Sequence, residues 1–192
     1  MSGRDRCQPH RRLNLLEIFM PTKPIINVAD VILESRPPIF APSGEVAKRF
    51  DAKLGYISSR IGAQKLGYNI TVVPPGKSAF PCHNHHANEE MFFVLQGIGE
   101  LRVGESIYPI RVGDVIACPP GGKETAHQII NIGAEELRYL AVSTKLSPEL
   151  AEYPNSGKFG VLAELPASGD GKPQRFIFVG RESQSLNYWE GE

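Results

Sequence analysis

The fold is decided by residues 76–97, GKSAFPCHNHHANEEMFFVLQG, in which three histidines precede an acidic pair and an apolar run. His83 and His85 are two residues apart, so on an extended strand both side chains point to the same face. Alternation along the apolar run that follows lets only one of Glu89 and Glu90 face inward. A His-x-His pair alone is usually a solvated pair, so a metal site needs further donors.

A second stretch, residues 113–131 (GDVIACPPGGKETAHQIIN), places His127 after a glycine-rich loop and before an apolar strand. If a small β-barrel brings His127 beside the first group, three imidazoles and one carboxylate form a mixed nitrogen and oxygen ligand set. Such a set suits a borderline divalent metal, namely Fe(II), Mn(II), Ni(II), Co(II) or Zn(II). Four protein ligands on a six-coordinate ion leave two positions for water or a chelating substrate.

Short apolar segments separated by Gly and Pro turns surround these two stretches. The predicted strands are 68–73, 90–95, 100–103, 106–112, 115–118, 128–132, 136–143 and 175–179. A strand every ~8–12 residues is typical of an all-β sandwich or barrel. Residues 147–153 instead favour one helical turn, because Ser147 can cap it and Pro148 suits its first position.

Taken together, the two stretches resemble the two sequence motifs of the cupin family. The first motif corresponds to Gly76-x6-His83-x-His85-x4-Glu90-x6-Gly97, and the second to Gly113-x5-Pro119-x-Gly121-x5-His127-x3-Asn131. The resemblance implies a cupin-type double-stranded β-helix, a jelly-roll barrel, and one divalent transition metal ion. It implies that the ligands are His83, His85, Glu90 and His127. The family's spacing selects Glu90 over Glu89, because only Glu90 leaves six residues before the glycine.

The second motif departs from the family pattern in one place. Five residues, Gly122–Ala126, separate Gly121 from His127 where the common form has two. This insertion leaves open whether His127 is able to ligate. The expanded loop is similar to that of bacterial single-domain cupins of largely unknown function, of the cupin 2 conserved barrel type, and the likeness extends over roughly residues 25–192.

The chain is expected to have four parts. Residues 51–146 form the cupin barrel core, 147–192 a C-terminal extension packed on the barrel, and 21–50 an N-terminal arm. Residues 1–20 are expected to be a disordered or mis-assigned extension, the latter if Met20, where the composition changes, is the true start and residues 1–19 lie upstream of it. Their Arg-rich beginning lacks the long apolar run and the cleavage site of a secretory signal.

The amino-acid composition limits the classes of partner that we expect this protein to bind. The chain has 21 basic and 21 acidic residues, which argues against a nucleic-acid partner, and no apolar run approaches the ~20 residues of a membrane span. Three cysteines (Cys7, Cys82 and Cys118) at unpatterned spacing do not form a disulfide framework and favour a reducing, cytoplasmic setting. We expect a small-molecule ligand and, from the resemblance, a homodimer that pairs through sheet edges and N-terminal arms, of which residues 21–50 would be one.

The leading interpretation is a metal-dependent enzyme that acts on a small organic substrate. With Fe(II) it would be dioxygenase-like, and with Mn or Zn isomerase-like. A sugar-phosphate isomerase-like role needs basic residues at the pocket mouth, for which the candidates are Arg102, Lys123 and Arg138. The candidate substrate-binding residues are Tyr68, Phe92, Gln96 and Tyr139, with Phe80 and Gln128 as further pocket-lining candidates.

The alternative is a non-catalytic cupin that binds a small molecule or a metal as a sensor or storage module. The pocket distinguishes the two interpretations. A metal with open positions that faces a closed apolar cavity favours catalysis, whereas a metal saturated by protein side chains favours a structural role.

Overall fold

The protein is described from a computed structural model, which defines residues 23–166 and 174–192. Within these ranges the chain is all-β, and its helical elements are short 3-10 turns rather than α-helices. These turns are η1 (Val28–Asp30), η2 (Pro38–Phe40), η3 (Gly44–Lys48), η4 (Ser58–Arg60), η5 (Lys123–Thr125) and η6 (Glu182–Gln184). The expectations for residues 1–20 lie outside the described residues.

The largest sheet has six strands in the order β1-β2-β3-β10-β5-β8, and all neighbours are antiparallel. Its strands are β1 (Glu34–Ser35), β2 (Lys53–Tyr56), β3 (Leu66–Val73), β10 (Leu137–Thr144), β5 (Glu90–Gln96) and β8 (Val115–Cys118). The chain-distant strands β3 and β10 pair along their whole length. This long-range pairing closes one wall of the barrel.

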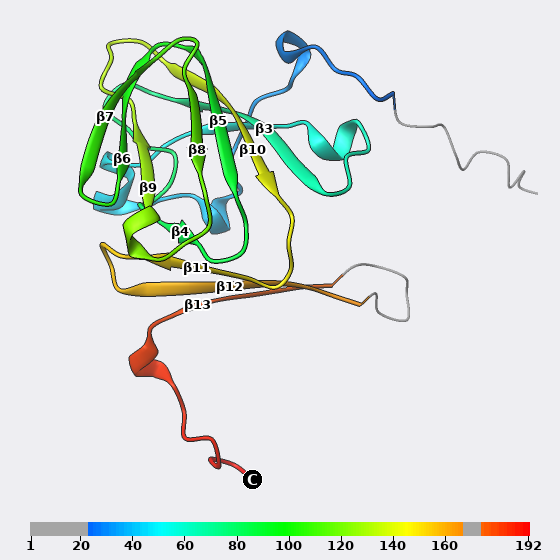
Figure 1. Cartoon of the computed structure of the whole chain (residues 1–192), viewed down its shortest axis with the longest axis vertical. Helices are drawn as coiled ribbons and strands as arrows, with labels where there is room; N and C mark the ends of the chain where they lie inside the picture. The colour runs from blue at the N-terminus through cyan, green and yellow to red at the C-terminus, as the bar shows by residue number, and fades with distance from the viewer. Residues whose placement is uncertain (1–22, 167–173) are drawn as a thin grey trace, which may run out of the picture.

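A second sheet, in the order β7-β6-β9, faces the first (Figure 1). Its strands are β7 (Ser106–Arg111), β6 (Ile98–Val103) and β9 (His127–Ile130). Side chains from both sheets form one apolar core, which includes Val73, Val94, Leu101, Ile110, Ile116, Ile129, Leu137 and Tyr139. The two sheets thus form the jelly-roll barrel predicted from the sequence.

Two glycines show why the motifs need that residue type. Gly97, between β5 and β6, has φ +84°, and a Cβ there would lie 2.7 Å from the Glu136 carbonyl oxygen. Gly113, between β7 and β8, has φ +93°. L-residues with a side chain rarely adopt this left-handed region, so glycine allows the chain to reverse at both places.

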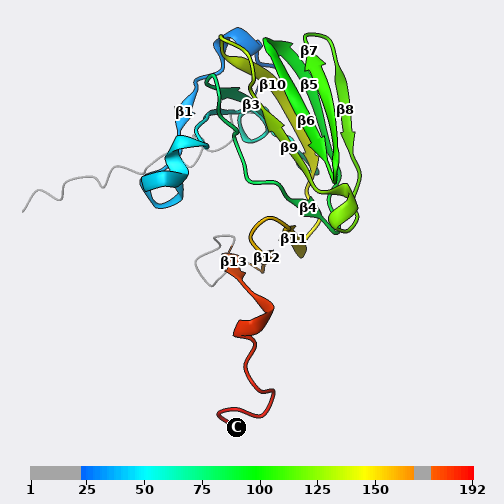
Figure 2. The ribbon, with the colours of Figure 1, turned by 90° about the vertical axis from the view of Figure 1, so that its left-hand side faces the viewer.

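A third sheet lies beneath the barrel in the order β13-β12-β11-β4 (Figures 1 and 2). Its strands are β13 (Gln174–Gly180), β12 (Lys158–Leu165), β11 (Glu149–Tyr153) and β4 (Asn84–His85). Because β4 lies within the first cupin-like stretch, this sheet reaches the histidines directly. We call β11, β12 and β13 the C-terminal sheet.

The helical turn predicted for residues 147–153 is wrong, because Glu149–Tyr153 form β11. This strand pairs with β12 on one side and β4 on the other, and these ladders satisfy more backbone groups than one helical turn would. Its alternation is also that of a strand: Glu149 and Ala151 are buried, while Leu150 is exposed.

The described part of the N-terminal arm packs on its own barrel. Val31 joins Ile57, Ile70 and Val72 in a second apolar cluster on the outer side of the six-stranded sheet. β1 extends that sheet by pairing with β2. The arm therefore covers a barrel wall of the same chain.

Candidate metal centre

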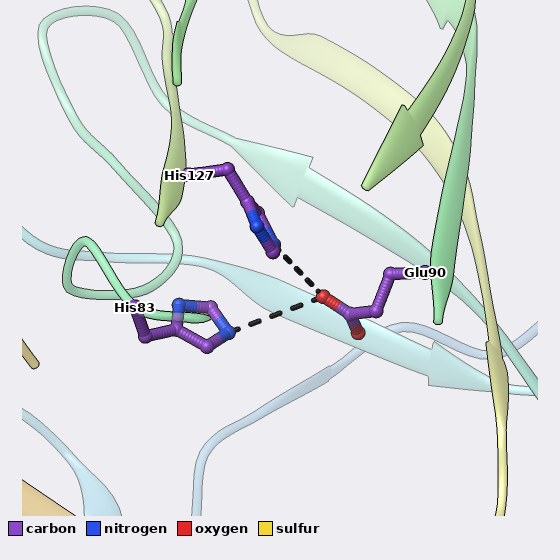
Figure 3. Close-up of side chains that lie close together, drawn as sticks. All are labelled: His83, Glu90 and His127. Carbon is purple, nitrogen blue, oxygen red and sulfur yellow. Dashed lines mark hydrogen bonds and ion pairs between the residues drawn. The ribbon is translucent and has the colours of Figure 1, made fainter. Parts of the chain in front are cut away.

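Three predicted ligands meet at one end of the barrel. His127 opens β9, Glu90 opens β5, and His83 lies in the loop before β4 (Figure 3). His83 and His127 exchange both backbone hydrogen bonds, at 3.1 and 2.8 Å, so the two cupin-like stretches are joined directly at the histidines. One potential ligand atom of each of the three residues lies within 4.8 Å of those of the other two.

The Glu90 carboxylate is the centre of this group. Its Oε2 lies 3.0 Å from His127 Nε2 and 3.9 Å from His83 Nε2 (Figure 3). His85 Nε2 lies 3.5 Å from the same oxygen. Three imidazoles thus converge on one oxygen of the Glu90 carboxylate.

These residues fit a divalent transition metal. Both ring nitrogens of His85 are buried and form no hydrogen bond within the described residues. Buried polar atoms without a partner are rare in folded proteins, and a metal ion is one of the groups that satisfies them. The donor set is the mixed nitrogen and oxygen set that borderline divalent metals prefer.

The electrostatics keep two of the donors, His83 and Glu90, in their metal-binding forms. Burial lowers the pKa of His83 to about 4, and the neighbouring His127 and His85 act in the same direction, so the imidazole is neutral. Burial alone would raise the pKa of Glu90, but contacts with His127 and His85 outweigh it and bring this pKa far below its usual range. Metal binding requires a neutral imidazole and an ionised carboxylate.

His85 differs from His83 in its neighbours. Burial would lower its pKa, but the Glu90 carboxylate and the charge of Glu149 outweigh that and raise it. The Glu149 Oε2 lies 3.8 Å from His85 Nδ1. His85 therefore stands between two carboxylates.

The inserted loop does not move His127 away from the group. Residues 122–126 fold into the 3-10 turn η5, in which Thr125 N donates to the Gly122 carbonyl at 3.0 Å. Gly104 N then donates to the Ala126 carbonyl at 2.8 Å. The turn absorbs the extra residues, and His127 starts β9 with its ring directed at Glu90.

A cavity of about 240 Å³ opens onto the four side chains. Its walls are mostly apolar, with two amide side chains. The remaining lining residues are Asn69, Phe80, Pro81, Phe92, Gln128, Ile129, Tyr139 and Ala141. A small organic molecule of a few heavy atoms would fill this space beside the donors.

The predicted substrate-binding residues divide into two groups. Phe92 and Tyr139 line the cavity, in edge-to-face contact at 5.5 Å between ring centroids. Tyr68 packs instead against the second apolar cluster outside the barrel, and Gln96 is exposed at the end of β5. Asn69 follows Tyr68 on β3 and points to the other face, so it lines the cavity where Tyr68 does not.

A buried carboxylate that the sequence reasoning missed holds the histidine loop in place. Glu149 accepts hydrogen bonds from the backbone N–H groups of His86, Ala87 and Asn88 at 3.1, 3.3 and 2.8 Å. The Asn88 side chain also donates to it, and to the Leu146 carbonyl at 3.1 Å. No local signal marks Glu149, because only the pairing of β11 with β4 brings it to the loop.

The comparisons with known proteins agree with this geometry. Residues 69–143 match the family model described as "Cupin domain". An uncharacterized protein of Methanocaldococcus jannaschii is 33% identical over 72 residues, which are 38% of this chain and 54% of that protein. The chain thus spans about half the length of this curated relative.

Two solved structures share the fold over most of the chain. A candidate sugar phosphate isomerase from Acidithiobacillus ferrooxidans has a TM-score of 0.63 at 23% identity, covering 80% of this chain and 92% of that one. A sugar phosphate isomerase of the cupin superfamily from Silicibacter pomeroyi has a TM-score of 0.66 at 19% identity, covering 86% and 98%. At these identities the likeness establishes the fold.

The described residues contain no helix with the length and apolar character needed to traverse a bilayer. Their all-β topology, the match over residues 69–143 and the shared fold of these two structures lead to the same assignment. Residues 69–143 match the cupin domain, and the barrel that contains them has the cupin fold.

Proposed function

We propose that this cupin is a metal-dependent enzyme that acts on a small, oxygen-bearing organic substrate. The observation that carries the proposal is the convergence of His83, Glu90 and His127, with His85 against the same carboxylate oxygen, at the end of a mostly apolar cavity. When bound, one Fe, Mn, Zn, Ni or Co ion would supply a Lewis acid and a template for a substrate oxygen pair.

The cavity residues have separate tasks in this proposal. Phe80, Phe92 and Ile129 exclude water from the reacting atoms. The Asn69 side-chain oxygen accepts a hydrogen bond from Thr71 at 2.8 Å, which fixes the amide so that its NH2 group can donate to a substrate oxygen. Gln128 donates to the Phe80 carbonyl at 2.8 Å, which leaves its own oxygen to accept a substrate hydroxyl.

An isomerase-like reaction on a sugar phosphate has one specific observation in its favour. A second cavity of about 240 Å³ shares His85 and Glu90 with the first, and Lys145, Arg175, Glu149 and Glu164 also line it. Arg175 pairs with Glu164 at 3.5 Å, so Lys145 is the cation that can attract a phosphate group within reach of the donors. The two solved structures named above as sugar phosphate isomerase and candidate sugar phosphate isomerase support the same choice.

The three cations suggested by the sequence line neither cavity. Arg102 donates to the Gly104 carbonyl at 2.9 Å and to the Asn155 side chain at 3.1 Å. Lys123 lines a separate surface pocket beside Glu152, and Arg138 is absent from the lining of both cavities. A dioxygenase-like reaction is the second candidate, since the first cavity has no Lys or Arg in its lining within the described residues.

Elemental analysis of protein purified without added metal tests the site. We expect about one first-row transition metal per chain, and its loss in the variant His83→Ala/His85→Ala. The control is His86→Ala, because His86 is partly exposed and pairs with Glu152 at 2.9 Å rather than with Glu90. Unchanged metal content in the double variant would refute the site.

Activity of the metal-loaded protein then separates the candidate functions. Interconversion of aldose and ketose phosphates supports the isomerase, and oxygen uptake with catechols, diketones or organic acids supports the dioxygenase. Metal binding without turnover on either panel would overturn the enzyme and favour the sensor or storage module.

Three further expectations stand as proposals. Residues 21–50, 51–146 and 147–192 serve as arm, barrel and extension of one folded unit. The protein works in the cytoplasm, which agrees with the free, buried thiols of Cys82 and Cys118. It also works as a homodimer.

A further inference from the structure

The free edges of the three sheets are protected unequally. β1 and β4 have two residues each, β8 and β9 have four, and β7 carries Pro109 in its middle. Short strands and prolines are the usual devices that prevent an edge from pairing with another chain. β13 has seven residues, Gln174–Gly180, with no proline and no lysine, so among the described strands it is the long unprotected edge.

The side chains of β13 are apolar on both faces of the strand. Phe176, Ile177, Phe178 and Val179 are 44–54% exposed. Arg175 is the single charged residue of the strand, and it pairs with Glu164 of the neighbouring β12 at 3.5 Å. Such a run on an unpaired edge is an aggregation hazard unless another surface covers it.

The outer face of the C-terminal sheet continues this apolar surface. Leu162, Glu164 and Arg175 line the second cavity, on the side of His85 and Glu90. Because strand side chains alternate, their neighbours in the sequence face away from the barrel. This outer face includes Leu150, Phe159, Val161, Ala163, Phe176 and Phe178, which the strand register aligns in rows, with Glu152 and Gln174 as its polar members.

The last twelve residues, Arg181–Glu192, leave β13 and extend away from the barrel in both views (Figures 1 and 2). They carry Leu186, Tyr188 and Trp189 at 74–84% exposure. Since a buried aromatic side chain removes about 150–250 Å² from water, the exposed parts of Phe176, Phe178, Tyr188 and Trp189 offer roughly 400–600 Å². With the aliphatic neighbours this approaches the ~800 Å² that each partner contributes to a standard interface.

We propose that β13 is the homodimer interface of this protein. Two copies pair their β13 strands antiparallel across a two-fold axis at Ile177, which merges the four-stranded sheets into one. This register uses all seven residues and sets Phe176 opposite Phe178 of the second copy, an aromatic cross-strand pair. Arg175 then faces Val179, so no like charges meet. The projecting C-terminal segment of each copy, Arg181–Glu192, lies against the apolar outer face of the other copy.

The resemblance led us to expect pairing through sheet edges and N-terminal arms, and β13 is such a sheet edge. The described part of the N-terminal arm already pairs and packs with its own barrel through β1 and Val31. Among the described residues, β13 has one hydrogen-bonded neighbour, β12, and its other edge is unpaired.

Disulfide trapping in the full chain tests the two-fold axis. In a Cys7→Ser background, Ile177→Cys should give a covalent dimer under mild oxidation, because residues directly opposite in an antiparallel pair fall within disulfide reach. The control is Ile107→Cys on the other apolar edge, β7, where Pro109 interrupts pairing. Equal cross-linking at both positions, or none at residue 177, would overturn the proposal.

Charge substitutions test the register of the proposed strand pairing, and light scattering measures the oligomeric state of each variant. Phe176→Lys or Phe178→Glu alone should convert the dimer to a monomer, whereas the double variant should restore it, since each ammonium then faces a carboxylate of the second copy. Circular dichroism and thermal unfolding check that every variant is folded. A wild-type monomer at micromolar concentration, single variants that stay dimeric, or a double variant that stays monomeric would contradict the proposed pairing.

Discussion

The barrel and the C-terminal sheet bury their apolar side chains in different ways. In the barrel, Val73, Val94 and Leu137 are completely buried, and strands from two sheets enclose them. In the C-terminal sheet, β11 faces the barrel while the residues of β13 from Gln174 to Val179 are all exposed. The barrel is complete as a single chain, whereas the C-terminal sheet reaches inward to the histidine loop and ends outward at the edge that we propose to pair with a second copy.

The largest expected effect contrasts a buried residue of the barrel with an exposed residue of the C-terminal sheet. Leu137→Ala should lower the free energy of unfolding by about 3–4 kcal/mol, because it leaves a cavity among fully buried side chains. Ile177→Ala should cost less than about 0.5 kcal/mol in the monomer, since exposed positions tolerate truncation. Urea denaturation, well below and well above the dimer dissociation constant, measures both.

The two regions should differ in how the cost of each truncation depends on protein concentration. The cost of Leu137→Ala should be the same at both concentrations, whereas that of Ile177→Ala should grow once the protein dimerises. Equal and concentration-independent costs would mean that β13 is buried within its own chain and would remove the contrast.

The barrel was largely predictable from the sequence, whereas of the C-terminal sheet only β13 was, as the strand predicted at 175–179. The strands predicted at 68–73, 90–95 and 136–143 match β3, β5 and β10 to within two residues, because period-two alternation and glycine turns are local signals. β12 was not predicted, and β11 was predicted as a helical turn. Both depend on pairing with residues distant along the chain, which a local pattern does not contain.

The candidate site, too, was predictable from the sequence only in part. His83, His85, Glu90 and His127 follow from motif spacing, and the barrel closes so that they meet. Their support does not follow from spacing, since Glu149 lies 61 residues after Asn88, to which it is bonded. Phe92 and Tyr139 were named for the cavity as aromatic residues near the motifs, and the same reasoning named Tyr68, whose strand position turns it outward.

The second prediction concerns pH and the barrel side of the site. Burial and the adjacent histidines lower the pKa of His83 to about 4, below its ordinary 6.5. Between these values the unfolded chain binds a proton that the folded protein does not, so the stability contributed by His83 is complete above pH 6.5 and falls as the pH drops towards 4. The loss should reach about 2–3 kcal/mol by pH 4.5, since one pKa unit is worth ~1.4 kcal/mol.

Chelator-treated protein isolates this effect from metal binding. The raised pKa of His85 changes the stability only above pH 6.5. Its stabilising contribution is complete below pH 6.5 and is lost as the pH rises through the pKa that His85 has in the folded protein. The lowered pKa of Glu90 changes the stability only below pH 4.5, where the carboxylate becomes protonated in the unfolded chain first. The slope between pH 4.5 and 6.5 therefore belongs to His83, and denaturation of His83→Gln should show it flattened. An equally steep slope in that variant would show that the buried imidazole is not its source.

The smallest effect tests whether the C-terminal sheet supports the metal centre. Glu149 and Glu152 lie on the same strand, and both accept hydrogen bonds from the histidine loop. Glu149 is buried, holds three consecutive backbone amides and faces His85, whereas Glu152 pairs with the partly exposed His86. If β11 positions the ligands, Glu149→Gln should weaken binding of Zn²⁺ or Mn²⁺ by about 10–100-fold, and Glu152→Gln should leave it unchanged.

Titration calorimetry on chelator-treated variants measures these affinities, and thermal unfolding of the same samples checks whether the barrel is intact. Glutamine keeps one acceptor oxygen but brings a donor towards the backbone amides, so it loosens the loop between His85 and Glu90 without opening a cavity. Equal affinity in the two variants would mean that the barrel alone positions its histidines. A selective loss in Glu149→Gln would instead make the C-terminal sheet, whose outer edge we assign to a second copy, part of the metal centre on its inner side.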